Sequence, residues 1–170
     1  PKGVGALLMR SRNYERPPLV PLMVGGGQER GLRPGTLPVP LIAGLGKAAE
    51  LASLNSLDRR AVCESIREKA LESFEGMDYQ INGDSSNSLN HTFNISIPGI
   101  NSEAAMIALK ETAFISNGSA CTSANYSLSH VLLAMGLPEE RIENALRISW
   151  SHLTPNIDWD LIIQKLSNLK

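Results

Sequence analysis

Short apolar runs and one glycine-rich stretch make up the beginning of the chain. Residues 3–10 (GVGALLMR) and 19–24 (LVPLMV) are apolar runs of strand length, and a proline-containing turn at 15–18 separates them. We therefore expect two short strands. The following stretch, 25–40 (GGGQERGLRPGTLPVP), is so rich in Gly and Pro that no regular structure is expected there.

Helical periodicity dominates the next part of the chain. A helix is expected from Pro40, with one apolar face formed by Leu41, Leu45, Ala48 and Ala52. A second helix is expected over residues 57–74, with an apolar stripe formed by Val62, Ile66, Ala70 and Phe74. Cys63 adjoins this stripe, and its position favours a packed thiol over a reactive one.

Strand patterns return in the second half of the chain. After the polar segment NGDSSNSLN, three segments are interpreted as strands: HTFNISI (91–97), TAFIS (112–116) and ALRISW (145–150). Between the first two, Ser102 is the expected N-cap of a helix, with Glu103 favourably placed in its first turn. The apolar residues of that helix are Met106, Ile107 and Leu109.

Three further helical segments complete the pattern. A short helix is expected over about 128–135, with Gly136 at its left-handed C-terminal position. Pro138 starts one more helical turn, and residues 154–155 (Thr-Pro) are expected to cap a last amphipathic helix that runs through Leu166. Strands mixed with several helices predict an α/β or α+β fold.

Composition and charge exclude several functions. The chain has 170 residues, 42% of them hydrophobic, and a formal net charge of −1, which suits one sizeable core. No basic surface for nucleic acid is expected, and no apolar run is long enough to span a membrane. The two cysteines have no zinc-binding spacing and form no disulfide framework, so we expect no metal, a reducing cytoplasm and a free thiol at Cys121.

Cys121 is the first candidate for chemistry. It lies in SNGSACTSANYSLSH (116–130), among small and hydroxylated residues rather than large apolar ones. A thiol reacts when it is accessible and partly ionised, which nearby positive charge or a helix N-terminus promotes. The residues alone leave two interpretations open: a nucleophile or sulfur carrier on a flexible loop, or an idle surface thiol.

The stretch 25–36 (GGGQERGLRPGT) is the second candidate. Repeated glycines with arginines can hold an anion through backbone N–H groups and guanidinium groups, and Thr36 adds a hydroxyl where a helix starts. The stretch is neither a Walker loop nor a GxGxxG motif. A plain tight connection remains the alternative.

Arg147 is the third candidate. Leu146 and Ile148 flank it in a strand, so Arg147 should point to the opposite face and offer its guanidinium to a cleft, where a carboxylate would fit. A solvated arginine explains the same spacing. The histidines are scattered without ligand spacing and are expected on surfaces and in loops: His91, His130 and His152.

Taken together, these segments resemble the cysteine desulfurases of the NifS/IscS type, pyridoxal-phosphate enzymes of the class-V aminotransferase family. The resemblance covers nearly the whole chain, in the family's order. Its segments are PKGVGAL, GGGQERGLRPGTLPV, NGD, NISI, GSACTSANYSLSHVLLAMGL and LRIS.

The resemblance implies a role for each candidate. Cys121 would attack the sulfur of a bound L-cysteine and keep it as a persulfide, releasing alanine. Arg147 falls on the arginine that holds the α-carboxylate of the substrate. Thr36 matches the threonine that reaches the cofactor phosphate across a homodimer, while the roles of Arg30 and Arg33 stay open.

The family also implies an organisation and partners. Residues 1–40 would end the large pyridoxal-phosphate domain, and 41–170 would form the small C-terminal domain of this α/β fold. The lysine that binds the cofactor belongs upstream of Pro1, so we expect a fragment that is inactive alone. Sulfur would pass to an acceptor protein for iron–sulfur cluster assembly or for thio-modification of tRNA or DNA, and the tail resembles the desulfurases of DNA phosphorothioation.

Two alternatives remain open beside this expectation. The first is a non-catalytic sulfur-relay or scaffold module that docks an acceptor, and the second is a selenocysteine lyase. In every case the expected localisation is the cytoplasm, with no membrane and no direct nucleic-acid partner.

Overall fold

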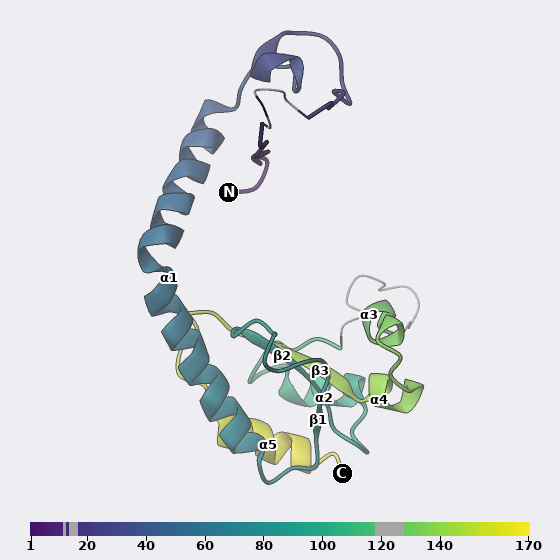
Figure 1. The fold of residues 1–170 in the computed structure, drawn as a ribbon. Coiled ribbons are helices and arrows are strands. Elements are labelled where there is room, and N and C mark those ends of the chain that lie inside the picture. Colours follow the sequence, from purple (N-terminus) through teal and green to yellow (C-terminus); the bar gives the residue numbers. More distant parts are fainter. Residues whose placement is uncertain (12, 14–16, 118–127) are drawn as a thin grey trace. The chain divides into compact units, whose positions relative to one another are not determined.

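A computed structural model describes residues 1–11, 13, 17–117 and 128–170 (Figure 1). The chain divides into two compact units, Pro1–Ser56 and Leu57–Lys170. The predicted assignment of 1–40 and 41–170 to two functional domains stays a prediction. None of the helices in the described part of the chain combines the length and apolarity needed to cross a bilayer.

The first unit contains a short 3-10 helix, η1 (Gln28–Gly31), and the first part of the long helix α1 (Val39–Phe74). The two strands expected at 3–10 and 19–24 are wrong, because the structure shows no strand at either place. A strand needs a neighbour that accepts and donates its backbone hydrogen bonds. No such ladder forms among the described residues of this unit, and the apolar side chains of both runs are largely exposed.

Helix α1 corrects the expectation of two separate helices. It is continuous over 36 residues and begins at Val39 rather than Pro40. The sequence has no Gly or Pro between Gly46 and Gly76, so no helix-breaking residue ends the helix at the polar segment in its middle. Asn55 Nδ2 donates to the carbonyl oxygen of Leu51 at 2.8 Å, and Ser56 Oγ donates to that of Ser53 at 3.5 Å.

An antiparallel sheet organises the second unit. Its strands lie in the order β1 (Gln80–Ile81), β2 (Thr92–Ser96) and β3 (Ala145–Ser149). This confirms the expected strands in HTFNISI and ALRISW. The register pairs every residue of β2 with one of β3, from Thr92 opposite Ser149 to Ser96 opposite Ala145.

One face of this sheet carries the core. Phe93, Ile95, Leu146 and Ile148 are buried on it, together with residues of the last turns of α1 and of α2 (Ser102–Leu109) and α5 (Trp159–Ser167). The N-caps of α2 and α5 are other residues than the sequence predicted. Asn101 Oδ1, not Ser102, accepts the N–H groups of Glu103 and Ala104, and Asp158, not Thr154, caps α5.

Two short helices cover one end of the opposite face. They are α3 (His130–Ala134) and α4 (Glu139–Glu143), and they bury Ala145 in a small cluster with Leu132 and Ile142. Gly136 joins them with φ of 74°, the left-handed conformation expected from its position. Pro138 precedes α4 as predicted.

The aromatic centre of the core determines how α1 packs on the sheet. Phe74 is fully buried, with its ring centroid 6.0 Å from that of Phe93, and Phe93 in turn lies 5.4 Å from Trp150. Trp150 Nε1 donates to the carbonyl oxygen of Cys63 at 3.0 Å. Cys63 is buried, as its position beside the apolar stripe predicted, whereas Val62 is 44% exposed.

We predict that Phe74→Ala lowers the free energy of unfolding by about 3–5 kcal/mol, because it leaves a cavity between α1 and the sheet. Urea denaturation followed by tryptophan fluorescence measures this loss. The matched control is Leu57→Ala, since Leu57 lies on the same helix but is 79% exposed, and its loss should stay below about 0.5 kcal/mol. Equal losses in the two variants would show that α1 does not pack as described.

Candidate functional site

The open face of the sheet presents Arg147. Along β3 the flanking Leu146 and Ile148 are buried in the core, whereas Arg147 is exposed. The alternation expected from the sequence is therefore observed. Helices α1, α2 and α5 pack on the other face, so the Arg147 side chain lies on the face that they do not cover.

Arg147 is the centre of a polar row that runs across the sheet. Asn94 of β2 is its direct partner on one side. On the other side, Ser116 forms an isolated bridge with it: Ser116 N donates to Arg147 O at 3.1 Å, and Arg147 N donates to Ser116 O at 2.6 Å. Directly opposed residues of antiparallel strands point to the same face. The strand expected at 112–116 is thus reduced to a single bridge, but that bridge lies at Arg147.

A closed hydrogen-bond network holds the far end of this row. Arg141 Nε donates to Asn82 Oδ1 at 2.7 Å, and Asn82 Nδ2 donates to Ser96 Oγ at 2.8 Å. Ser96 Oγ donates back to the carbonyl oxygen of Arg141 at 2.7 Å, which closes the ring. Asn82 Nδ2 also donates to Asn94 Oδ1 at 2.6 Å, so the network extends to the residue opposite Arg147.

Three arginines of this unit differ in the partners of their side-chain N–H groups. Arg67 Nη1 donates to the carbonyl oxygens of Leu89 and Thr92, and Arg141 donates to Asn82 and to the carbonyl oxygen of Ile81. The Arg147 guanidinium has no ion-pair partner among the described residues. Arg67 and Arg141, by contrast, use their side-chain donors within the fold.

Cys121 lies outside the described residues, so its predicted role stays a prediction. Ser116, paired with Arg147, precedes it by five positions in the sequence.

The loop that carries Thr36 belongs to the first unit. Thr36 is exposed and lies just before α1. The start of α1 offers little backbone for an anion, because Pro38 and Pro40 lack an N–H and Val39 N donates to Leu37 O. Side-chain donors such as the Thr36 hydroxyl therefore add to the few backbone donors near this helix start.

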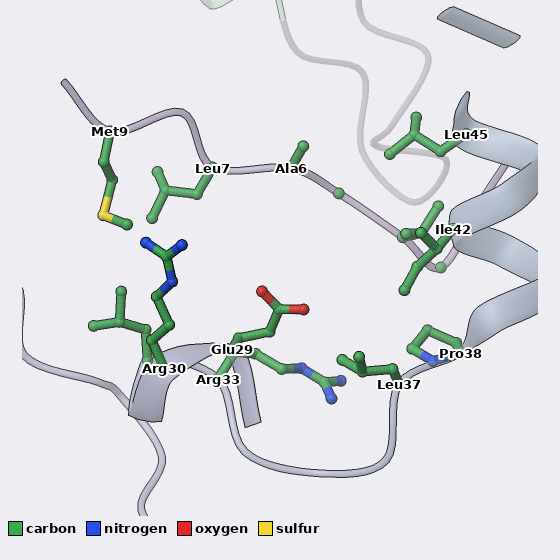
Figure 2. A pocket seen from close by; sticks show the side chains of 14 residues that line it. Ala6, Leu7, Met9, Glu29, Arg30, Arg33, Leu37, Pro38, Ile42 and Leu45 are labelled. Atoms are coloured by element: carbon green, nitrogen blue, oxygen red, sulfur yellow. The ribbon is translucent and has the colours of Figure 1, made fainter. Parts of the chain in front are cut away.

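Two arginines near Thr36 line a cavity of about 760 Å³ within the first unit. Figure 2 shows Arg30 and Arg33 with Glu29 on one side of this cavity, facing the segment of Ala6, Leu7 and Met9. Glu29 and Arg30 have left-handed backbone, with φ of 49° and 59°, and Gln28 Oε1 braces the turn by accepting Gly35 N at 3.1 Å. The turn therefore places the acidic side chain of Glu29 and the basic side chains of Arg30 and Arg33 along the same cavity.

The remaining polar residues show no catalytic grouping in the described ranges. No group of three or more His, Cys, Asp and Glu residues that could hold a metal forms there. His91 and His130 are exposed and His152 is half-buried. One carboxyl group responds to its surroundings: hydrogen bonds from Ser86 and Asn87 lower the pKa of Asp84, in an exposed loop.

The comparison with protein families identifies the class of this chain. The family model described as aminotransferase class-V matches residues 1–158. The chain belongs to this family, and the mixed helix-and-strand structure agrees with its NifS-like members.

Curated relatives make the similarity more specific. The chain is similar to cysteine desulfurase IscS of Rickettsia felis, with 39% identity over all of this chain and 42% of the relative. It is also similar to cysteine desulfurase IscS of an Anaeromyxobacter species, with 39% identity over all of this chain and 43% of the relative. The chain therefore spans about two fifths of the length of these relatives.

Solved structures agree. DndA from Streptomyces lividans has a TM-score of 0.63 and 40% identity, over 81% of this chain and 38% of that one. A NifS-like protein from Rickettsia africae has a TM-score of 0.72 and 28% identity, over 88% of this chain and 39% of that one.

The polar network around Arg141 was missed by the sequence analysis. One signal was present, because Thr92, Asn94 and Ser96 are the polar positions of an alternating strand. Nothing in the local sequence of Asn82 or Arg141 indicates that they meet across the sheet, since 59 positions separate them.

We predict that Arg141→Ala lowers the free energy of unfolding by about 1.5–3 kcal/mol, because it leaves Asn82 Oδ1 and the Ile81 carbonyl without their charged donor. Chemical denaturation of the variant measures the loss. The control is Arg60→Ala, which removes an exposed ion pair with Glu64 at 2.7 Å and should cost clearly less. A loss no larger than that of the control would contradict the network as a stabilising element.

Proposed function

We propose that this chain is part of a pyridoxal-phosphate-dependent cysteine desulfurase. Its membership of the aminotransferase class-V family and its similarity to proteins named cysteine desulfurase support this activity. In the proposal, Arg147 binds the α-carboxylate of L-cysteine and Cys121 accepts its sulfur.

The bridge between Ser116 and Arg147 is the observation that carries the proposal. Two backbone hydrogen bonds connect the strand of the carboxylate-binding arginine to the segment that leads to Cys121. Binding of the substrate carboxylate and delivery of the thiol therefore depend on the same strand edge. An uncommitted guanidinium suits a carboxylate because its planar donors match two oxygens.

The chemistry follows from these positions. The Cys121 thiolate forms a bond to the sulfur of the substrate, and the bond between that sulfur and the substrate β-carbon breaks. Its electron pair remains with the carbon skeleton, which takes up a proton and leaves as alanine, so Cys121 retains the sulfur as a persulfide. When bound, pyridoxal phosphate supplies the electron sink that makes this cleavage possible.

Thr36 is the residue of this chain that we assign to the cofactor. Its hydroxyl is exposed in a loop that also carries Arg30 and Arg33, and hydroxyl and guanidinium donors suit a phosphate. Because the start of α1 offers few backbone donors, the hydroxyl of Thr36 would make the direct bond. We further propose that this contact forms across a homodimer, with Thr36 holding the cofactor of the other subunit.

The proposal extends to location and partners. A cytoplasmic enzyme would pass its persulfide sulfur to an acceptor protein for iron–sulfur cluster assembly or for thio-modification of tRNA or DNA. The similarity to DndA is the observation behind the DNA branch.

We predict that Cys121→Ser abolishes persulfide formation in the complete protein, because a hydroxyl cannot accept the substrate sulfur. The protein is incubated with L-cysteine and its thiols are alkylated. Mass spectrometry of the peptide that contains position 121 then measures the extra sulfur. Cys63→Ala is the matched control and should keep persulfide formation, since Cys63 is only 7% exposed. Persulfide on the Cys121→Ser protein would show that another residue is the acceptor.

We also predict that Arg147→Gln raises KM for L-cysteine about 10- to 100-fold, as expected for the loss of a charge-assisted hydrogen bond. Steady-state alanine release measures the change. Arg60→Gln, an exposed arginine on α1, should leave KM within about twofold. If Arg147→Gln leaves KM at the wild-type value, Arg147 does not bind the substrate carboxylate.

A further inference from the structure

Asn94 and Arg147 are two polar residues that lie side by side on the sheet. They are direct partners in the antiparallel register of β2 and β3, on the face that α1, α2 and α5 do not cover. Partners in such a pair have their Cβ atoms about 4.5–5.5 Å apart. A polar side chain of fixed orientation therefore lies beside the exposed guanidinium.

The orientation of the Asn94 amide is determined by a chain of donors that starts at Arg141. An arginine Nε can only donate, so the atom of Asn82 that faces it must be the acceptor Oδ1. The amide nitrogen of Asn82 then lies on the other side and donates to Asn94 Oδ1 at 2.6 Å. Asn94 consequently directs its oxygen into the network and keeps its Nδ2 donor for another partner.

Two neighbouring donor groups cannot satisfy each other. The Arg147 guanidinium carries only donors, and the Asn94 oxygen is already bonded to Asn82. Both groups are satisfied together only by an acceptor, and an anion with two oxygens is an acceptor that two donor groups can share. The paired donors therefore specify a carboxylate more closely than Arg147 alone.

We propose that Asn94 Nδ2 donates a hydrogen bond to the substrate carboxylate that Arg147 binds, and that Asn82 and Arg141 are the positioning residues that orient this donor. This inference rests on the proposed function, because it gives the site its second carboxylate-binding residue. Asn94 is half-buried, which limits competition from water and strengthens such a bond.

The test is the variant Asn94→Asp in the complete protein. The substitution keeps an oxygen for Asn82 but replaces the donor with a second acceptor, which repels a carboxylate. Calorimetry measures the dissociation constants of L-alanine and of L-alaninamide, which lacks the carboxylate. We expect the affinity for L-alanine to fall about 10- to 100-fold, while the affinity for L-alaninamide does not fall. The control Asn90→Asp lies off the row, where Asn90 Nδ2 donates to Arg60 O, and should change neither constant.

A structural role alone gives a different result. If Asn94→Asp weakens both ligands equally, or neither, the inference is overturned. The new carboxylate of Asn94→Asp can also pair with Arg147, which alone would weaken binding of L-alanine, so two uncharged variants complete the test. Asn94→Ser restores a donor and should keep the preference for the carboxylate ligand better than Asn94→Ala. Equal preferences in these two variants overturn the inference. Release of alanine from L-cysteine by the wild-type protein tests the proposed function separately. If the wild-type protein releases alanine but Asn94→Asp leaves the ratio of the two dissociation constants unchanged, only the role of Asn94 is overturned.

Discussion

The pairing of β2 with β3 is the constraint on which the second unit depends. Its register places Ile95 opposite Leu146 and Asn94 opposite Arg147. The side-chain period of a strand is two, so a slip of one residue would turn the arginine into the core and an isoleucine to the surface. The buried helices α1, α2 and α5 fix the register from one face, and the position of the guanidinium on the other face follows from their packing.

The polar residues on the open face become more exposed from one end of the sheet to the other. At one end Ser96 and Ala145 are buried under α3 and α4, and there the polar atoms form a closed network with Arg141. At Asn94 the same face is half-buried, and at Arg147 it is exposed. Donors lose water near the covered end but find their acceptors there. Among the described residues, no side-chain partner is found for the Arg147 guanidinium, which lies at the exposed end of this gradient.

The sequence predicts elements best where a single chain segment determines them. The alternation in HTFNISI and ALRIS identifies two central strands, and Gly136 marks a helix end, because each pattern reflects local geometry. The runs at 3–10 and 19–24 were wrongly predicted as strands because a strand also requires a neighbour, which a local pattern does not specify. The break expected inside α1 is absent because the polar residues there, such as Asn55 and Ser56, have only weak helix-breaking tendency and no Gly or Pro accompanies them. Arg147 was identified as a candidate from its flanking residues. The polar positions of β2 were also visible in the sequence, but no local pattern indicates that Asn82 and Arg141 meet there, because 59 positions separate them.

The partners of their side-chain N–H groups separate Arg67 and Arg141 from Arg147. A guanidinium has five N–H groups, and a half-buried one is stable only when acceptors surround it. Arg67 and Arg141 meet this condition with carbonyl oxygens and an amide, so their charge serves the fold. Arg147 itself forms the bridge with Ser116, yet only its backbone is bonded among the described residues. A strand whose backbone is bonded on both sides fixes the Cα position of Arg147, while its exposed side chain keeps its rotamer freedom. In the proposed function, binding of a carboxylate therefore has to order this side chain, but not the strand that carries it.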